Sequence, residues 1–191
     1  MPPQKPDRQK LDRRQQRTRH ALLRAFRDLI LQRRYDDFGV ADVAARAQVS
    51  RSTLYQHFAG KDALLAASIA VPFAGLAATL GEEDNSRELV TLLDHFWSNR
   101  ALARVLFSGA ARHKTVAVLI DQIERNLKSA GYGRRACLIL PIRLAAVQLA
   151  ECLLSPVAAW LAGESRCTAD ALAHGLRQAG RGALASLRAA V

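Results

Sequence analysis

The sequence has few of the features that mark secreted or disulfide-stabilised proteins. Its 191 residues include three cysteines, which cannot all pair with one another. No disulfide framework is therefore expected, and the composition suits a reducing compartment. Residues 1–11 are polar and lack the apolar segment, followed by small residues, that defines a secretory signal. These absences predict a cytoplasmic protein.

Motifs of catalysis, cofactor binding and metal binding are missing as well. The chain has no Gly-rich phosphate loop, no Gly-x-Ser-x-Gly elbow and no Cys-x-x-Cys pair. Its five histidines are scattered, without the spacing of metal ligands. We therefore expect no metal, no cofactor and no enzymatic activity. An α-helical metabolite-binding or enzymatic module stays as an alternative, because residues far apart in sequence can assemble a site in three dimensions.

One long, mostly apolar run, residues 136–162, could be mistaken for a membrane span. It contains Arg143 and Glu151, and each would cost about 2.5 to 3.5 kcal/mol near the bilayer centre. On a helix its polar side chains fall within one arc of about 140°. A soluble helix buried on most sides fits this pattern better, so no membrane association is expected.

Acidic residues are scarce in the first third of the chain. The whole sequence has a net charge of +11, from 28 basic and 17 acidic side chains. Residues 1–61 contain 14 of the basic and 6 of the acidic ones, and no Asp or Glu lies between 44 and 61. Such concentrated positive charge favours a polyanion, because each neutralised phosphate releases condensed counterions. A solvated basic tail, or a basic protein that binds DNA without sequence preference, would share this charge.

Apolar spacing predicts three helices in this basic segment. Residues 1–15, with three prolines and little to bury, are expected to form a disordered basic tail. A shorter apolar repeat from Val40 predicts a helix of about two turns. Ser50 is then placed to cap a third helix over 51–57. The first helix, over 16–34, is predicted by five apolar residues on one face: Leu22, Ala25, Phe26, Leu29 and Ile30.

Two short helices joined by a tight turn, after a longer helix, form a helix-turn-helix arrangement. We place the motif at about 38–57, within a DNA-binding domain of residues 16–61. Leu54 and Phe58 are four residues apart and point inward, so the second short helix presents a polar outer face. In this arrangement that helix lies in the major groove of DNA. Its outward residues are the candidate DNA contacts: Arg51, Ser52, Thr53, Tyr55, Gln56 and His57.

The remaining residues, 62–191, show helical patterns without a strand signal of useful length. A helix from Lys61 to about 71 should be ended or kinked by Pro72. Further helices are expected over 87–98, 99–107, 112–130, 135–162 and 168–190. The fold class is therefore all-α, with an N-terminal three-helix DNA-binding domain and a C-terminal helical domain over 62–191.

The last two predicted helices are candidates for a dimer interface. The helix over 168–190 carries a stripe of small residues, Gly175, Ala179 and Ala183. A glycine costs about 1 kcal/mol relative to alanine in an isolated helix, and only packing can offset this cost. We infer that helices 135–162 and 168–190 pair with their copies in a homodimer. The alternative is that they only close the core of one chain.

Aromatic and polar residues from several predicted helices are candidates for a ligand pocket. Their character suggests a small-molecule effector that is mostly apolar or aromatic. Aromatic residues at helical spacing are also common in plain cores, so both interpretations stay open. The candidates are Phe73, His95, Phe96, Trp97, Phe107, Gln148 and Trp160.

The stretch VADVAARAQVSRSTLYQHFAGKDALL, residues 40–65, resembles the DNA-binding segment of the tetracycline-repressor (TetR-like) family of transcriptional regulators. The most specific part is Leu-Tyr-x-His-Phe at 54–58, followed by Lys61 and a Leu-Leu pair. The resemblance implies a dimer that binds a near-palindromic operator in double-stranded DNA. It also implies a repressor that is released when a small molecule binds among the C-terminal helices. The implied phosphate contacts are Tyr55, His57 and Lys61, and the implied base contacts are Arg51, Ser52 and Gln56.

The sequence departs from the family pattern in three places. Phe38 and Gly39 stand where the family commonly has Thr or Ser, so a hydroxyl contact to phosphate is missing there. Gln48 stands where the turn usually has Gly, and it would be strained if its φ were positive. Ser52 replaces a frequent Gly and adds a hydroxyl that could alter base choice.

Overall fold

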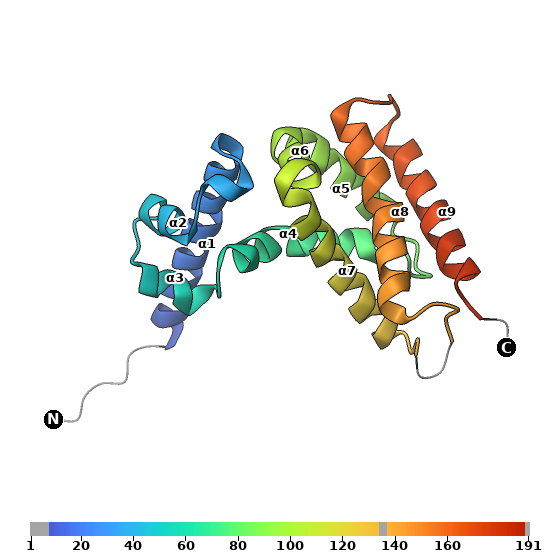
Figure 1. Cartoon of the computed structure of the whole chain (residues 1–191), viewed down its shortest axis with the longest axis horizontal. Helices are drawn as coiled ribbons and strands as arrows, with labels where there is room; N and C mark the ends of the chain where they lie inside the picture. The colour runs from blue at the N-terminus through green and yellow to red at the C-terminus, as the bar shows by residue number, and fades with distance from the viewer. Residues whose placement is uncertain (1–7, 134–136, 190–191) are drawn as a thin grey trace. The chain divides into compact units, whose positions relative to one another are not determined.

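The computed structural model describes residues 8–133 and 137–189, and within these residues the fold is all-helical, as the sequence predicted (Figure 1). Short 3-10 turns at Tyr35–Asp37 and Gly109–Ala111 precede α2 and α7. The described residues contain one isolated β-bridge, between Leu138 and Arg188. The helices are α1 (Arg8–Gln32), α2 (Val40–Arg46), α3 (Arg51–His57), α4 (Lys61–Ala78), α5 (Ser86–Ser98), α6 (Arg100–Phe107), α7 (Arg112–Ser129), α8 (Ile142–Ala162) and α9 (Ala169–Ser186).

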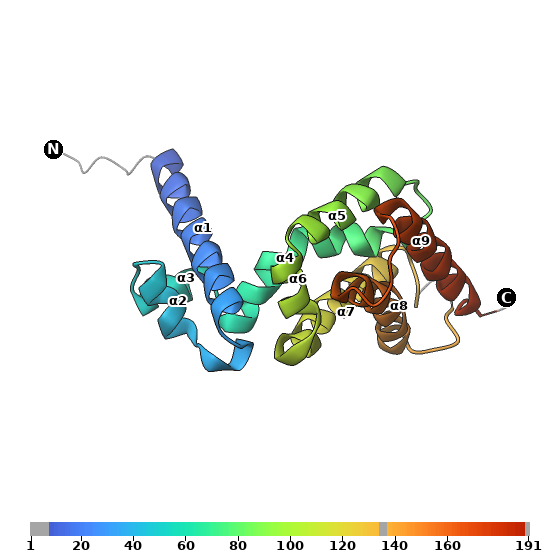
Figure 2. The same ribbon diagram turned by 90° about the horizontal axis from the view of Figure 1, so that it is seen from above.

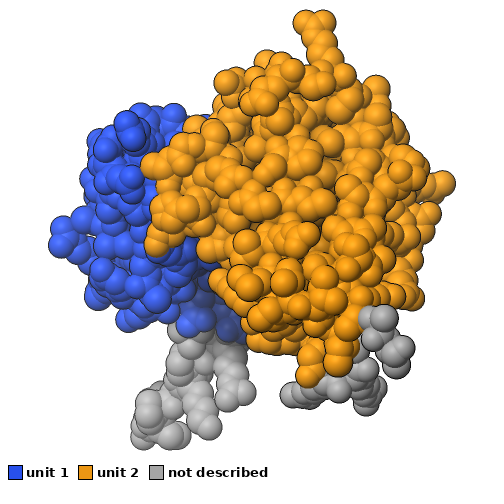
Figure 3. All heavy atoms as spheres, turned by 45° about the vertical axis from the view of Figure 1, so that its right-hand side comes forward, with its two compact units in different colours: residues 1–68 blue, residues 69–191 orange. Residues whose placement is uncertain are grey.

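The chain divides into two compact units, and the division falls inside α4, after Ser68 (Figure 3). The sequence placed this boundary at residue 61, before the helix. The first two turns of α4 instead belong to the first unit, and they contribute the fully buried side chains of Leu64 and Leu65. The first compact unit therefore extends beyond the DNA-binding domain of 16–61 that the sequence predicts, and the bounds of that domain stay a prediction.

Apolar faces of α1, α2 and α3 form the core of the first unit. The five apolar residues that predicted the first helix are all buried, with at most 5% of their surface exposed. The ring of Phe26 contacts those of Tyr35 and Phe38 edge-on, with centroids 6.5 and 5.9 Å apart. Figures 1 and 2 both show α2 and α3 on the same side of α1. Helices as short as α2 and α3 are stabilised by this packing, because isolated helices of that length are not stable in water.

α1 begins earlier than predicted. The helix starts at Arg8, so the expectations of a first helix from residue 16 and of a disordered tail over 1–15 were wrong for residues 8–15. Most of these eight residues are Arg, Gln or Lys, which have high helix propensity and extend a helix that the core has already nucleated. Residues 1–7 of the predicted tail lie outside the described residues.

α4 continues through Pro72 to Ala78, so the predicted end of this helix at residue 71 was wrong. A proline inside a helix removes one backbone hydrogen bond. Ile69 and Phe73, on either side of the proline, are both buried. Packing of the apolar face therefore offsets the hydrogen bond that is lost.

α8 begins at Ile142 rather than at residue 135. Pro141 precedes it, and the residue before a proline avoids the helical conformation, so the described residues 137–140 do not join the helix. Residues 134–136 lie outside the described residues. The last helix, α9, ends at Ser186 rather than at residue 190.

α8 packs against α7 and α9, which lie beside it in Figure 1, and also contacts α6. Nine of its 21 residues are buried within the single chain. Burial on most sides stays a prediction, because it includes contacts with a second chain. Leu144 and Val147 on its other side are 53% and 36% exposed. Nothing else in the described part of this single chain covers that side.

By length and composition, α4 and α8 could each cross a membrane, but core helices of soluble proteins pass the same test. Half of the apolar window of α8 is buried inside the chain. Its charged residues also form ion pairs with α7. The guanidinium of Arg143 lies 2.5 Å from the carboxylate of Asp121, and the carboxylate of Glu151 lies 2.6 Å from the guanidinium of Arg112. These contacts favour a core helix.

The glycines of α9 have different surroundings. A Cβ atom at Gly180 would lie 2.9 Å from a methyl of Leu80 and 3.2 Å from one of Leu153, so this glycine permits close packing inside the chain. At Gly175 and Gly182, a Cβ atom would have no described neighbour within 4 Å. The cost of these two glycines is therefore not offset by packing within the described part of one chain.

Candidate nucleic-acid interface

α3 occupies the residues that the sequence predicted, Arg51–His57. Ser50 caps it, because its hydroxyl accepts a hydrogen bond from the backbone N–H of Thr53 at 3.0 Å. Leu54 is fully buried and Phe58 is 4% exposed, so both point inward as expected. The polar side of α3 is thereby turned outward.

Six of the predicted contact residues belong to α3, and most of them are exposed. Tyr55 has 55% of its surface exposed. Arg51 forms no ion pair with any of the described residues. A guanidinium, a phenol and an amide therefore lie together on one outer face. The exposed residues are Arg51, Ser52, Tyr55 and Gln56, and the partly buried ones are Thr53 and His57.

Hydroxyl groups cluster at the start of α3. Ser50 Oγ lies 2.8 Å from Ser52 Oγ and 2.8 Å from Thr53 Oγ1. A hydroxyl can donate one hydrogen bond and accept two, so these contacts leave Ser52 and Thr53 with capacity for a further partner. The two side chains can thus help to hold the start of the helix and still bind DNA.

Gln48, in the turn between α2 and α3, has a φ of 56°. A residue with a Cβ atom in this left-handed region costs about 1 to 2 kcal/mol. Among the residues with a described backbone, it is the only non-glycine with positive φ. The strain expected from the missing glycine is therefore confirmed.

We expect Gln48→Gly to stabilise the DNA-binding unit by about 0.5 to 1 kcal/mol, because the strain released exceeds the chain entropy that glycine adds. Urea denaturation followed by far-UV circular dichroism measures this change. Gln56→Gly, at an exposed position within α3, is the control and should destabilise by about 1 kcal/mol. A Gln48→Gly variant that unfolds no later than the wild type would contradict the interpretation.

Gly39 is the N-cap of α2 and offers no side chain to cap it. The carboxylate of Asp42 instead accepts from the backbone N–H of Gly39 at 2.8 Å. A carboxylate oxygen of Asp42 also lies 3.6 Å from the guanidinium of Arg33, the residue after α1. α2 therefore begins without the hydroxyl that is common in the family pattern.

Lys61, the seventh predicted contact residue, points into the first unit instead of joining the face of α3. Its ammonium donates to the backbone carbonyls of Tyr35 at 2.6 Å and Phe38 at 2.8 Å. It also lies over both rings, 4.2 and 5.0 Å from their centroids. A phosphate contact would require the ammonium to leave these carbonyls.

A second contact fastens the same part of α4. The phenol of Tyr35 donates to Asp62 Oδ1 at 2.6 Å. Burial of Tyr35, and then this hydrogen bond, raise the pKa of the phenol far above its usual value, so it stays protonated. Lys61 and Tyr35 together hold the start of α4 against the segment between α1 and α2.

Two carboxylates of the first unit are paired with arginines of the same unit. The carboxylate of Asp28 lies 3.6 Å from the guanidinium of Arg46, and that of Asp42 lies 3.6 Å from the guanidinium of Arg33. Other arginines of α1 and α3 form no ion pair with the described residues, so the unit keeps positive charge that phosphates can neutralise. These are Arg13, Arg14, Arg17, Arg19, Arg24, Arg27 and Arg51.

None of the seven predicted ligand-pocket residues lines either of the two cavities described among residues 8–133 and 137–189. Phe107 lies between two other rings, with centroids 5.9 Å from Phe73 and 5.2 Å from Phe96. All three are at most 5% exposed, so they form part of the core. Their proposed contact with a ligand stays a prediction.

The other four candidates lie elsewhere. Trp97 and Trp160 contact each other with ring centroids 4.7 Å apart. The indole of Trp160 donates to the carbonyl of Cys167 at 3.1 Å. His95 and Gln148 are exposed, on α5 and α8. This distribution favours a structural role for the tryptophan pair.

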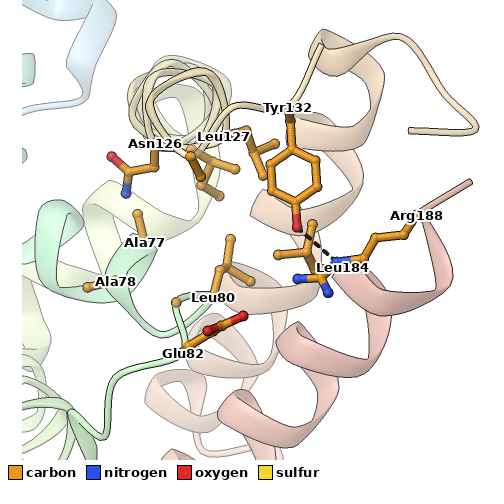
Figure 4. A pocket seen from close by; sticks show the side chains of 12 residues that line it. Ala77, Ala78, Leu80, Glu82, Asn126, Leu127, Tyr132, Leu184 and Arg188 are labelled. Atoms are coloured by element: carbon orange, nitrogen blue, oxygen red, sulfur yellow. Dashed lines mark hydrogen bonds between the residues drawn. The ribbon is translucent and has the colours of Figure 1, made fainter. Parts of the chain in front are cut away.

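A cavity of about 470 Å³ lies at another place in the second unit, and it is lined by none of these seven residues (Figure 4). Its walls come from the end of α4 and the turn after it, the second half of α7 with Tyr132, and the end of α9. The wall residues are mostly alanine, leucine and isoleucine, which carry no distinctive chemistry in a sequence. Sequence reasoning missed the cavity because three helix ends meet there only in the fold.

These features define the class of the protein: an all-helical chain with an N-terminal helix-turn-helix DNA-binding unit. Residues 22–68 match the family described as bacterial regulatory proteins, tetR family. Residues 22–68 therefore carry a tetR-family domain, and the resemblance seen in the motif is confirmed.

A curated relative from Bacillus subtilis (strain 168), the uncharacterized HTH-type transcriptional regulator YxbF, is 33% identical over 66 residues. The match covers 34% of this chain and 17% of the length of that relative. The likeness therefore concerns the DNA-binding part.

Two solved structures share the fold over most of the chain. A TetR transcriptional regulator from Streptococcus agalactiae 2603V has a TM-score of 0.57 and 22% identity, covering 90% of this chain and 98% of the other. A TetR transcriptional regulator from Rhodococcus sp. RHA1 has a TM-score of 0.51 and 20% identity, with coverage of 90% and 98%. At these identities the likeness shows a common fold.

Proposed function

We propose that this chain is a sequence-specific DNA-binding transcriptional regulator that works in the cytoplasm. The observation that carries the proposal is the outer face of α3, where Arg51 and Gln56 are exposed beside Tyr55. Arginine pairs in a bidentate way with guanine, and glutamine with adenine, in the major groove. Tyr55 and His57 suit phosphate oxygens, which fix the register of the protein on the duplex. Enzymatic activity is no part of the proposal.

A homodimer through α8 and α9 is the second part of the proposal. Gly175 and Gly182 have open space where a Cβ would lie, and Ala179 between them is exposed. Leu144 and Val147 of α8 are exposed as well. Small residues on one helix let a second helix approach closely, and the apolar side chains would then be removed from water. Two chains related by a two-fold axis would bury these faces.

The dimer would bind a near-palindromic operator as a repressor. Two α3 helices related by a two-fold axis read half-sites about 34 Å apart, or a multiple of that distance. A small molecule that binds better to the conformation with the wrong spacing would release the DNA, and operator DNA would weaken the binding of that molecule to the same extent.

Selection of DNA from a random pool tests the proposal. A specific regulator should enrich one near-palindromic sequence and bind it about a thousandfold or more tighter than random DNA at physiological salt. A basic protein without sequence preference would bind both about equally and with steep salt dependence. That second outcome would refute the proposed function.

Variants of α3 should separate base reading from phosphate binding. We expect Arg51→Ala to lose about 1 to 3 kcal/mol of discrimination at particular base pairs. Tyr55→Ala should weaken binding to operator and random DNA alike, because a phosphate contact carries no sequence information. Arg104→Ala, which removes an equal charge from an exposed position on α6, is the control. Titrations against the operator and its single-base variants measure both effects, and unchanged binding by both α3 variants would exclude this assignment of contacts.

A further inference from the structure

One wall of the cavity between α4, α7 and α9 is built by the way α7 ends. Gly131 has a φ of 90°. The N–H groups of Gly131 and Tyr132 donate to the carbonyls of Lys128 at 3.1 Å and Leu127 at 3.0 Å. This is the Schellman pattern, which brings the residue after the glycine against the last turn of the helix. Tyr132 and Leu127 both line the cavity, and Tyr132 is 8% exposed.

Arg188, on the same side of the cavity, is held by a second local structure. Two backbone hydrogen bonds, 2.9 and 3.0 Å long, join residues 137–139 to residues 187–189. The side chain is fixed as well, because its Nε donates to the hydroxyl of Tyr132 at 2.9 Å (Figure 4). The two terminal nitrogens of the guanidinium have no partner among the described residues.

We propose that this cavity binds an amphipathic carboxylate, a small molecule with one carboxylate group and an apolar body. The terminal nitrogens of Arg188 form a planar fork that matches a carboxylate in a bidentate way. The hydroxyl of Tyr132 can donate to the same group while it accepts from Nε. The volume of about 470 Å³ is ordinary for a small-molecule site.

The apolar body of the ligand is accommodated by the rest of the lining. Leu80, Ile123 and Leu184 are buried residues that border the cavity. Figure 4 shows Ala77 and Ala78 of α4 on the side away from Tyr132 and Arg188. A ligand with its carboxylate at Arg188 would therefore extend toward α4 over apolar surface, which removes that surface from water.

Hydrogen-bond donors outnumber acceptors among the polar groups of the lining. Asn126 accepts at its Oδ1 from Gln122 at 3.1 Å, so its amide nitrogen is the group that can serve a ligand. Glu82, on the loop after α4, is the one carboxylate of the lining, and no ion pair joins it to Arg188 among the described contacts. A carboxylate in the lining would repel a ligand anion, so removing its charge should strengthen binding.

The inference deepens the effector response proposed above, and its test uses the full chain without DNA. Failure to bind the ligand would therefore leave DNA selection unaffected, and failure of DNA selection would not change ligand binding. The probes are octanoate, octanol and octylamine, which share one chain length and differ in head group. Isothermal titration calorimetry gives the affinities. Thermal unfolding followed by tryptophan fluorescence reports on the second unit, because Trp97 and Trp160 both lie there.

Octanoate should bind most tightly of the three and raise the unfolding temperature. Arg188→Gln should weaken octanoate about tenfold or more, and Glu82→Gln should strengthen it. Ala78→Phe, at an exposed position in the lining, should block it. Arg166→Gln, which removes an exposed charge outside the lining, is the control and should leave binding unchanged.

Three results would overturn the proposal. One is the absence of octanoate binding at millimolar concentration, and another is tighter binding of octylamine than of octanoate. The third is octanoate binding that survives both Arg188→Gln and Ala78→Phe. Circular dichroism of each variant checks its fold, and Arg188→Lys, which keeps the charge but loses the fork, should retain part of the affinity if Arg188→Gln proves unstable.

Discussion

We expect Ala179→Glu to convert the protein from a dimer to a monomer and to weaken operator binding by about a hundredfold or more. Ala179 is exposed on α9 between two glycines whose outer sides are open. In the proposed dimer a glutamate there would be removed from water without a partner and would face its own copy across the two-fold axis. A monomer presents one α3 helix. It therefore loses the gain in affinity that a dimer has because binding of one half-site raises the effective concentration of the second α3 helix at the other half-site.

Light scattering coupled to gel filtration measures the mass, and operator titration measures the affinity. Ala101→Glu makes the same substitution at an exposed position on α6 and should leave both unchanged. A wild type that is a monomer at micromolar concentration, or an Ala179→Glu dimer with full affinity, would place the interface elsewhere.

We expect Lys61→Met to destabilise the DNA-binding unit by about 2 to 3 kcal/mol in the absence of DNA. The ammonium of Lys61 donates to two partly buried carbonyls, at 2.6 and 2.8 Å, and methionine would leave both without this donor. Hydrogen bonds to a charged group contribute about 1.5 to 3 kcal/mol each, and the apolar part of the side chain is retained. The pair of rings beneath the ammonium adds to the loss.

Urea denaturation followed by far-UV circular dichroism reports on both units, whereas tryptophan fluorescence reports on the second. The unfolding of the first unit, seen by circular dichroism, should therefore shift to lower urea concentration. The fluorescence transition of the second unit should stay in place. Arg34→Met removes an equal charge from an exposed position in the same unit and serves as the control. If Lys61→Met unfolds like the wild type but loses affinity for all DNA, the side chain acts as a phosphate contact in solution.

The candidate DNA-binding site could be predicted from the sequence because it is local. The cap at Ser50, the inward pair Leu54 and Phe58, and the outward polar residues all lie within nine positions, where helical periodicity determines direction. Lys61 was predicted less well. Its partners Tyr35 and Phe38 are more than twenty residues away, and periodicity contains no information on contacts at that separation.

The proposed ligand site could be predicted less well than the DNA contacts, because it depends on distant segments. The sequence suggested aromatic residues as ligand contacts, but Phe73, Phe96 and Phe107 pack against one another in the core. The cavity is bordered instead by small and aliphatic residues at three helix ends. A void depends on how neighbouring helices approach, and a sequence pattern does not report that distance.

By itself, the sequence determined the all-helical class, the helix-turn-helix unit, the family of that unit and the direction in which α3 presents its polar side. All of these follow from residues that are near one another in the chain, where helix geometry relates position to direction. Only the tertiary structure decided that α4 continues past Pro72, that Lys61 is bound inside the first unit and that Arg188 and Tyr132 meet at a cavity. Each of these depends on packing between distant segments, whose buried surface outweighs local propensity.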